Sequence, residues 1–599
     1  MNEKRLWKLF LLPSLGGVLV FYLLPFVLSL YYGMIDNMGS RQFVGLQNVV
    51  ETLTNPMFLQ AAGNTAVYLG LSIPLILLLS LGLALLLHRS NSTLLFALLV
   101  PLVLPSGVTA FFWNAIFSAG GLVNKILYLL ELPLINWKTS AVAIIIPVIL
   151  FLWKNTGLIT AIMLIGYSRI PREYYEIAAG EGATPRVCFY KVTLPYLAPT
   201  LFLSGLIAVI QSFKVFRELY ILFGAYPNPH LYLLQHYMNN QFSSLNLQKL
   251  SAASHILFVL MAAVILLTYL IQKRLSDRFT SVELSPTKVL SAGKKTSTLA
   301  GKLVLWAAVA VSLFPLLFTV TNSFLSPQEV INRYSSQMLP GNAGSLARDG
   351  LHFVQMTLLP TEPTLAQYKE FLLQSPEQLR LFWNSVLLIV PILLGQLVVS
   401  VLAAYAFERS RWKYKEVVFA VYLVILLMPM QVTLVPNYIT ADLLGLLNSY
   451  WAIILPAMFH PLGVFLLRLQ MKGFDRSWVE AAQDCGASEW QIFRRVILPN
   501  LRPGIMVVLV LTVAEYWNII DQAIVFLDTT VQQPLSVSLS QMLAGESGIF
   551  FAASCVYVLP VLLVFGMGKS SGMCELQGQH LAKPDAGWYH NRKQTRQPR

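Results

Sequence analysis

Long apolar runs separated by short polar stretches dominate this chain of 599 residues. An α-helix needs about 20 predominantly apolar residues to cross the hydrocarbon core of a bilayer, and twelve stretches approach that length. The runs show no repeated alternation with a period of two, so the pattern does not favour a membrane β-barrel. The predicted spans lie near residues 9–32, 64–87, 94–118, 141–165, 197–223, 252–271, 303–325, 381–407, 417–437, 450–469, 501–521 and 549–566.

The composition agrees with a membrane protein and excludes other classes. Apolar residues make up 56% of the chain, charged residues make up 12%, and the mean hydropathy is +0.63. Soluble domains carry about 25% charged residues, and disorder requires low hydrophobicity and high charge. In a soluble protein the net charge of +14 would suggest nucleic-acid binding, whereas in a membrane protein it first suggests basic cytoplasmic loops.

The distribution of basic residues predicts the orientation of the chain. Lys4, Arg5 and Lys8 precede the first apolar run, which is longer than a signal-peptide core and lacks an obvious cleavage site. With the N-terminus in the cytoplasm, most of the 42 Lys and Arg residues fall on inner segments, as the positive-inside rule requires. The positive charge therefore indicates topology, and no nucleic-acid partner is expected. The four cysteines would be cytoplasmic or within the membrane, so no disulfide framework is expected.

The loops after the fourth and tenth predicted spans (residues 171–199 and 475–503) repeat one pattern. The matched residues, all 304 positions apart, are Glu176 and Glu480, Gly182 and Gly486, Leu194 and Leu498, and Pro199 and Pro503. Glycine adopts backbone angles that other residues avoid, and proline favours the start of a helix. Each loop is therefore predicted to form a short amphipathic helix, a glycine turn and a second short helix, a rigid charged element suited to docking on a partner.

The repeat divides the chain into two halves of six predicted spans each, residues 1–271 and 303–566. Residues 272–302 between them are polar and basic, which is typical of a cytosolic linker and also suits contact with anionic lipid headgroups. Residues 567–599 form an atypical polar tail, to which we assign no function. The sequence thus predicts an all-α polytopic membrane protein of twelve helices.

The two loops resemble the EAA loop of bacterial ABC importer permeases. The second copy contains Glu480-Ala481-Ala482, and the first contains the mild departure Glu176-Ile177-Ala178. In the family an aspartate usually precedes the glycine, whereas here Glu181 and Cys485 hold that place.

The resemblance extends along nearly the whole chain. Gly45-Leu46-Gln47-Asn48 and Asn64-Thr65 are similar to the first permease of the maltose-type carbohydrate-uptake subfamily. Asn384-Ser385, Ala403–Phe407 and Trp517-Asn518 are similar to its second permease. The chain therefore resembles both permease subunits fused in one polypeptide.

This resemblance implies a transport mechanism and its partners. A cytosolic ABC ATPase dimer binds the two loops, its ATP-driven closure rocks the halves between inward-facing and outward-facing states, and an external solute-binding protein delivers a sugar or oligosaccharide. The residues to which the resemblance assigns ATPase coupling are Glu176, Gly182, Glu480, Ala481, Ala482 and Gly486. The alternative role for the two glutamates is structural: each carboxylate only stabilises its own helix by interacting with the helix dipole. The chain contains no Walker A motif, so we expect no enzyme activity and no cofactor in this chain, ATP and Mg²⁺ being bound by the ATPase.

Ionisable residues interrupt several predicted spans at membrane depth, where they are costly and usually face a cavity or a partner. The candidate substrate-binding residues are Lys214, Arg217, Glu218, Trp517 and Asn518. The first three share one helical face by their spacing. Aromatic rings suit the apolar faces of sugars, and charged groups suit hydroxyls or a carboxylate, so an anionic sugar is one hypothesis. The alternative is an ion pair between the halves, such as Arg217 with Asp521, that fixes packing and never meets substrate.

Two other classes of protein compete with the importer. A twelve-span secondary transporter is also built from two halves, but it has no paired Glu/Gly/Leu-Pro loops. A membrane enzyme such as a polysaccharide synthase needs a catalytic cytosolic domain, for which the inner loops are too short. No His, Cys, Asp and Glu cluster has the spacing of a metal site.

Overall fold

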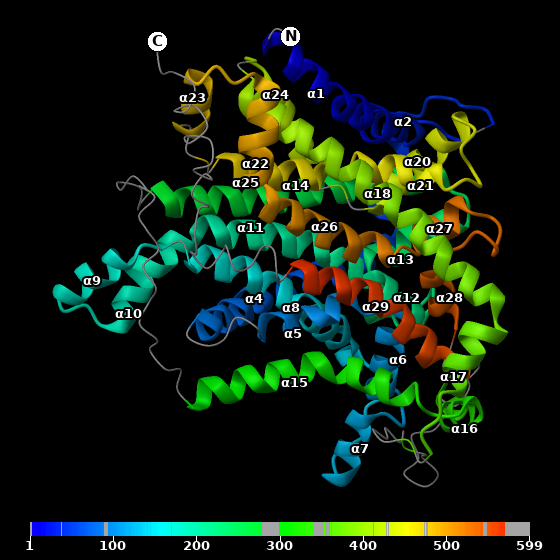
Figure 1. Cartoon of the computed structure of the whole chain (residues 1–599). Helices are drawn as coiled ribbons and strands as arrows, with labels where there is room; N and C mark the ends of the chain where they lie inside the picture. Colours follow the sequence, from blue (N-terminus) through cyan, green and yellow to red (C-terminus); the bar gives the residue numbers. More distant parts are fainter. Residues whose placement is uncertain are drawn as a thin grey trace, which may run out of the picture.

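The computed structural model of this chain is built from helices (Figure 1). The structure describes residues 3–568 except 38, 89–93, 138, 169, 278–298, 339–352, 354–359, 361, 411, 427, 429, 473, 475–476 and 543–547. Within these ranges every named element is a helix, and the one β-type pairing is an isolated bridge between Ile35 and Phe43. The all-α class is therefore confirmed. Most of the predicted linker and nearly all of the predicted tail lie outside the described residues.

The helices of the first half follow the apolar runs. Their bounds are α1 Glu3–Val18, α2 Leu24–Tyr32, α3 Gln47–Thr54, α4 Pro56–His88, α5 Leu94–Val103, α6 Ser106–Phe117, α7 Leu122–Leu129, α8 Ile145–Ser168, α9 Arg172–Gly180, α10 Pro185–Cys188, α11 Leu194–Ser212, α12 Phe216–Phe223, α13 Leu234–Ser243 and α14 Leu247–Asp277. A π-helical turn joins α1 to α2, and a 3₁₀ turn joins α11 to α12.

The second half repeats this order from α15 onwards. Its helices are α15 Leu299–Asn322, α16 Pro327–Met338, α17 Ala366–Lys369, α18 Pro376–Arg409, α19 Lys415–Leu426, α20 Met430–Leu443, α21 Trp451–Met458, α22 Pro461–Lys472, α23 Ser477–Asp484, α24 Glu489–Ile492, α25 Leu498–Asn500, α26 Arg502–Trp517, α27 Asp521–Phe526, α28 Leu535–Gln541 and α29 Phe550–Gly568. The helices α14 and α15 both extend into the range predicted as linker.

The number of spans differs from the predicted twelve. Nine helices in the described residues are long and apolar enough to cross a bilayer, or ten if the bent pair Glu489–Asn500 and Arg502–Trp517 is one span. The predicted span near 94–118 is broken between α5 and α6 at Pro105, which lacks a backbone N–H and ends the helix before it. The predicted span near 417–437 is divided between α19 and α20. The total of twelve is therefore not confirmed.

The first helix of each half packs against the opposite half. α1 lies along α18, and its residues Phe10 and Leu11 are buried in one cluster with Tyr405. α15 lies along α5, where Leu305 and Val309 are buried. In Figure 1, α1 runs along the upper edge of the molecule and α15 along the lower edge. Because each half buries apolar side chains of a helix from the other, the two halves are tied together.

The halves also repeat one set of hydrogen bonds. Asn64 donates to two backbone carbonyls in the segment before α13, at 2.6 and 3.0 Å, and Asn384 donates to two carbonyls in the segment before α28, at 2.8 and 3.0 Å. Thr65 and Ser385 each accept from the first N–H of those helices at 3.0 Å. An asparagine and a hydroxyl side chain therefore hold the corresponding segment in both halves, so the internal repeat reaches beyond the two loops.

Candidate functional site

The first repeated element (residues 171–199) folds into helix, turn and helix. At the end of α9 the N–H of Ala183 donates to the carbonyl of Ala178 at 2.9 Å, and that of Gly182 donates to Ala179 at 3.0 Å. This pair of hydrogen bonds is a Schellman motif. Gly182 has a φ of +75°, and a Cβ at this position would meet no atom within 4 Å. The backbone conformation, and not crowding, therefore favours glycine here.

The second repeated element (residues 475–503), whose first two residues lie outside the described part, forms the same turn. At the end of α23 the N–H of Ala487 donates to the carbonyl of Ala482 at 3.0 Å, and that of Gly486 donates to Gln483 at 2.8 Å. Gly486 also has a φ of +75° and open space around it. The sequence repeat is therefore a repeat of backbone geometry.

The agreement continues beyond the glycine turn. Thr184 and Ser488 cap α10 and α24 with side-chain oxygens that accept from the backbone. One π-helical turn then follows in each copy, over Phe189–Thr193 and Phe493–Ile497, at the same offset of 304 positions. In Figure 1, α9 and α23 lie toward the left side of the molecule, away from α27 and α28 on the right.

The predicted coupling residues lie where a partner can reach them. One of the six, Ala482, is half-buried against the core, and the exposed ones are Glu176, Gly182, Glu480, Ala481 and Gly486. Glu480 lies in the first turn of α23, where the helix dipole favours a negative charge. Each element therefore presents a carboxylate and an accessible glycine turn on one short helical unit.

The second repeated element is tied firmly to the core. The Glu489 carboxylate accepts from the Arg409 guanidinium at 2.6 Å and from the Tyr405 hydroxyl at 2.7 Å. The ring of Phe10 on α1 lies 5.5 Å from that of Phe493 and 6.2 Å from that of Trp490. A helix that begins the chain therefore supports the loop of the second half.

Tyrosines hold the first repeated element. The Tyr175 hydroxyl lies 2.9 Å from the Thr193 hydroxyl, and the rings of Tyr174 and Tyr196 lie 5.0 Å apart. Burial raises the pKa of Tyr175 above its ordinary value, because removal from water disfavours the charged phenolate. The first element has no carboxylate at the place of Glu489, since Pro185 stands there.

Two ion pairs join the halves at the candidate substrate site. The Lys214 ammonium lies 2.9 Å from the Glu515 carboxylate, and the Arg217 guanidinium lies 3.2 Å from the Asp521 carboxylate. Arg217 also donates to the backbone carbonyl of Asn518. The side chains of Lys214 and Arg217 are 45% and 20% exposed. The inter-half ion pair considered from the sequence is thus present, with a second pair beside it.

The other three predicted substrate residues are buried. Glu218 has no exposed surface and pairs with Lys154 of α8. The Trp517 indole donates to the carbonyl of Tyr557 at 2.9 Å, and the Tyr557 hydroxyl donates to the Asn518 side chain at 2.9 Å. In this state these three side chains contact neighbouring helices and present no free surface to a ligand. The prediction that all five residues line a cavity stays a prediction.

Sequence reasoning missed two further charged residues. Arg468 of α22 is 1% exposed, its guanidinium lies 4.0 Å from the centre of the Phe419 ring, and it pairs with Glu416 at 2.5 Å. Its place at the end of an apolar run was the signal that could have found it. The structural role of Glu489 was missed because the corresponding residue of the first copy is a proline, so the repeat did not mark this position.

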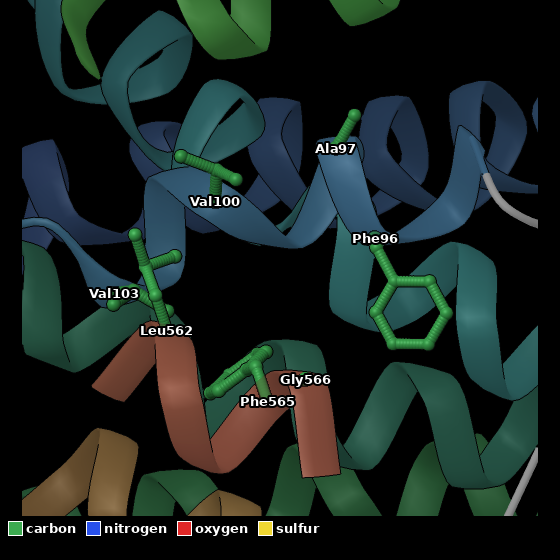
Figure 2. A pocket seen from close by; sticks show the side chains of 7 residues that line it. All are labelled: Phe96, Ala97, Val100, Val103, Leu562, Phe565 and Gly566. Atoms are coloured by element: carbon green, nitrogen blue, oxygen red, sulfur yellow. The ribbon is translucent and has the colours of Figure 1, made fainter. Parts of the chain in front are cut away.

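An apolar groove lies between α5 and α29 (Figure 2). Its lining residues are Phe96, Ala97, Val100, Val103, Leu562, Phe565 and Gly566. It offers no polar side chain for a sugar hydroxyl. In the part of the chain that the structure describes, no group of three or more His, Cys, Asp or Glu residues could hold a metal ion.

Comparison with known families identifies the two halves. The family described as "Binding-protein-dependent transport system inner membrane component" matches residues 57–281 and 396–570. Each match contains one of the two repeated elements. The two matches therefore correspond to the two halves that the internal repeat defines.

Known relatives are permeases of about half this length. The chain is 29% identical to the trehalose/maltose transport system permease protein MalF of Thermococcus litoralis, over 38% of this chain and 79% of MalF. It is 31% identical to the arabinooligosaccharides transport system permease protein AraP of Bacillus subtilis, over 46% of this chain and 90% of AraP. A crystal structure of a bacterial alginate ABC transporter is 22% identical over 47% of this chain and 98% of that chain, with a TM-score of 0.39. This chain belongs to the binding-protein-dependent transport inner-membrane component family, as a multi-pass inner-membrane permease that carries two family units in one polypeptide.

Proposed function

We propose that this chain forms both membrane halves of an ATP-driven importer that moves a sugar or oligosaccharide into the cytoplasm by alternating access. The observation that carries the proposal is the pair of repeated elements, which share a Schellman turn, a capped second helix and a π-helical turn at one offset. The relatives named for trehalose/maltose and arabinooligosaccharides support the choice of a carbohydrate.

The two repeated elements are the docking sites for a cytosolic ABC ATPase dimer, one for each subunit. The exposed carboxylates of Glu176 and Glu480 make the charge contacts, and the turns at Gly182 and Gly486 present them. Ala481 and Ala482 form the small-residue face of the second element. ATP and Mg²⁺ bind to the ATPase, whose closure is transmitted through these elements to the helices that follow them.

The substrate route runs between the halves. Lys214 and Arg217 face it, because they join the halves and retain exposed side chains. Glu218, Trp517 and Asn518 fix the neighbouring helix ends by their buried contacts. The two inter-half ion pairs balance their own charge, which favours a neutral substrate over an anionic one.

The N-terminus and both repeated elements lie on the cytoplasmic side in this proposal, and an external solute-binding protein docks on the opposite side. The distribution of Lys and Arg supports this orientation. Anionic lipid headgroups on the cytoplasmic side suit the basic segment between the halves.

Purification of the chain from its native membrane, followed by reconstitution, tests the function. We expect a stoichiometric ATPase to accompany the wild-type chain and ATP-driven sugar uptake into vesicles with binding protein. Gly486→Pro inserts normally but loses ATPase coupling, because proline cannot adopt a φ of +75° and removes the N–H that donates to Gln483. Normal uptake by this variant would refute the docking role, and proton-driven uptake without an ATPase would refute the importer.

A further inference from the structure

The ion pair between Arg217 and Asp521 joins residues that occupy the same position in the two repeats. They are 304 positions apart, which is the offset of the two repeated elements and of the two π-helical turns. In a two-fold arrangement, a residue contacts its own equivalent only close to the symmetry axis. This contact therefore marks the pseudo-two-fold axis that relates the halves.

On both sides a short helix follows a long one close to this contact. α11 ends at Ser212 and α12 begins at Phe216, while α26 ends at Trp517 and α27 begins at Asp521. In the first half a continuous 3₁₀ turn, Phe213–Val215, joins α11 to α12, whereas in the second half Asn518 and Ile520 leave helical backbone angles between α26 and α27. Arg217 and Asp521 each lie in the first turn of the short helix that follows. A short helix after an interruption can turn relative to the long helix before it, which places a hinge in the second half directly beside Asp521.

We propose that Arg217 and Asp521 form a gate on the translocation route, closed in this state by their ion pair and opened when the halves separate. This inference rests on the proposed function, because a route between two equivalent halves runs along their axis. At 3.2 Å between the guanidinium and the carboxylate, no sugar ring fits between the two side chains. Passage therefore requires this contact to break.

The surrounding contacts fit a closure that can open and close again. Lys214 and Glu515 form a second pair beside the axis, at 2.9 Å, with side chains 45% and 29% exposed. All four side chains keep 20–45% of their surface exposed, so separating the pairs does not leave a charge fully enclosed by apolar side chains. Sugar hydroxyls can then bind the separated groups as the substrate passes, which makes the gate selective for polyhydroxylated molecules.

Glu218, the neighbour of Arg217, keeps the gate arginine on its own half. It is fully buried, pairs with Lys154 and accepts from the Ser106 hydroxyl at 2.9 Å, and both partners belong to the first half. The Glu218 charge is thus occupied within its half, while Arg217 is directed across the axis. Opening of the gate therefore breaks only the ion pairs between the halves, and the contacts of Glu218 remain.

A cross-linking experiment tests the gate. The chain with Cys188, Cys485, Cys555 and Cys574 replaced by serine carries Arg217→Cys and Asp521→Cys, and a short bifunctional methanethiosulfonate reagent links them. A spacer is needed because the length of arginine separates the Cβ atoms beyond the reach of a direct disulfide. We expect cross-linking to stop the ATP-driven sugar uptake that the unlinked double-cysteine chain retains in vesicles, and a reductant to restore that level. In each single-cysteine variant the reagent forms no link between the halves, so its uptake stays above that of the cross-linked chain. Undiminished uptake by the cross-linked chain would overturn the proposal.

A charge exchange provides the second test. Arg217→Asp alone places two carboxylates on the axis, so we expect ATP hydrolysis without loaded binding protein to rise about tenfold, together with leakage of sugar from preloaded vesicles. Adding Asp521→Arg restores the pair with the halves exchanged, so both readouts return close to wild type. A double variant as leaky as the single variant would contradict the gate. Failure of the wild-type chain to take up sugar with ATP would instead refute the proposed function, so the two failures are distinguishable.

Discussion

Replacement of Gly182 by alanine isolates the contribution of the glycine turn to ATPase docking. At a φ of +75° an L-residue with a Cβ costs roughly 1–2 kcal/mol more than glycine. No atom lies within 4 Å of the added Cβ, so the whole cost is conformational and the new methyl group meets no clash. This cost lowers the ratio of formed to unformed turn about 5–30-fold, so if docking requires the formed turn, the affinity for the ATPase falls by up to that factor.

The first repeated element offers a matched control. Gly180, two residues earlier, ends α9 with an ordinary backbone and also has open space around it, so Gly180→Ala adds the same methyl group without the strain. Because alanine is about 1 kcal/mol better than glycine in a helix, this control is neutral or slightly stabilising. Gly182→Asn gives an intermediate case, since asparagine tolerates the left-handed conformation better than alanine.

The assay is the affinity of the co-purifying ATPase for the permease in nanodiscs, together with ATP hydrolysis stimulated by loaded binding protein. We expect Gly182→Ala to weaken binding within the range above, Gly182→Asn to weaken it less, and Gly180→Ala to match the wild type. Thermal unfolding of the membrane part should be the same for all four proteins, because the turn contacts no core residue. Wild-type affinity in Gly182→Ala, or an equal loss in Gly180→Ala, would refute the reasoning.

Three further predictions concern the packing that supports these elements. Glu416→Gln should lower the unfolding temperature more than Arg468→Met. Glu416→Gln removes the charged partner of a guanidinium that is 1% exposed, whereas Arg468→Met leaves the Glu416 carboxylate, which is 60% exposed and stays hydrated. A larger loss from Arg468→Met would contradict this prediction. Asn384→Ala should destabilise the chain by about 1–3 kcal/mol through the loss of two hydrogen bonds, measured by denaturation in detergent, and an unchanged stability would show that water replaces them. Phe10→Ala, which removes a ring packed on the second repeated element, should weaken ATPase affinity as well as stability, whereas Leu12→Ala, at a position 66% exposed, should change neither.

Several features of the fold were readable from local sequence alone. The glycine turns were predicted because a helix that ends in a left-handed residue favours glycine, and both Gly182 and Gly486 have a φ of +75°. The all-α class followed from apolar runs of membrane length. The count of spans was less secure, because Pro105 breaks one run into α5 and α6 and the sequence does not reveal whether a proline bends a span or ends it.

The candidate site shows where local reasoning stopped. The sequence placed Lys214 and Arg217 at membrane depth and offered the pair of Arg217 with Asp521 as an alternative, but it did not pair Lys214 with Glu515, which is 301 positions away. Trp517 is predicted to contact a sugar, and only the structure shows that in this state its indole donates to a backbone carbonyl of α29 and its ring is buried. A side chain's surroundings depend on which helices stand beside it, and a single sequence carries no record of that arrangement.

By itself, the sequence determined the membrane location of this protein, its division into two equivalent halves and the geometry of the two repeated elements, because each depends on hydrophobicity or backbone preference within a few turns of chain. Only the tertiary structure decided that α1 and α15 pack on the opposite halves and that Arg217 meets its own equivalent Asp521 on the axis between them. Those contacts depend on the shapes of whole helices packed side by side, where burial and charge are settled between residues hundreds of positions apart.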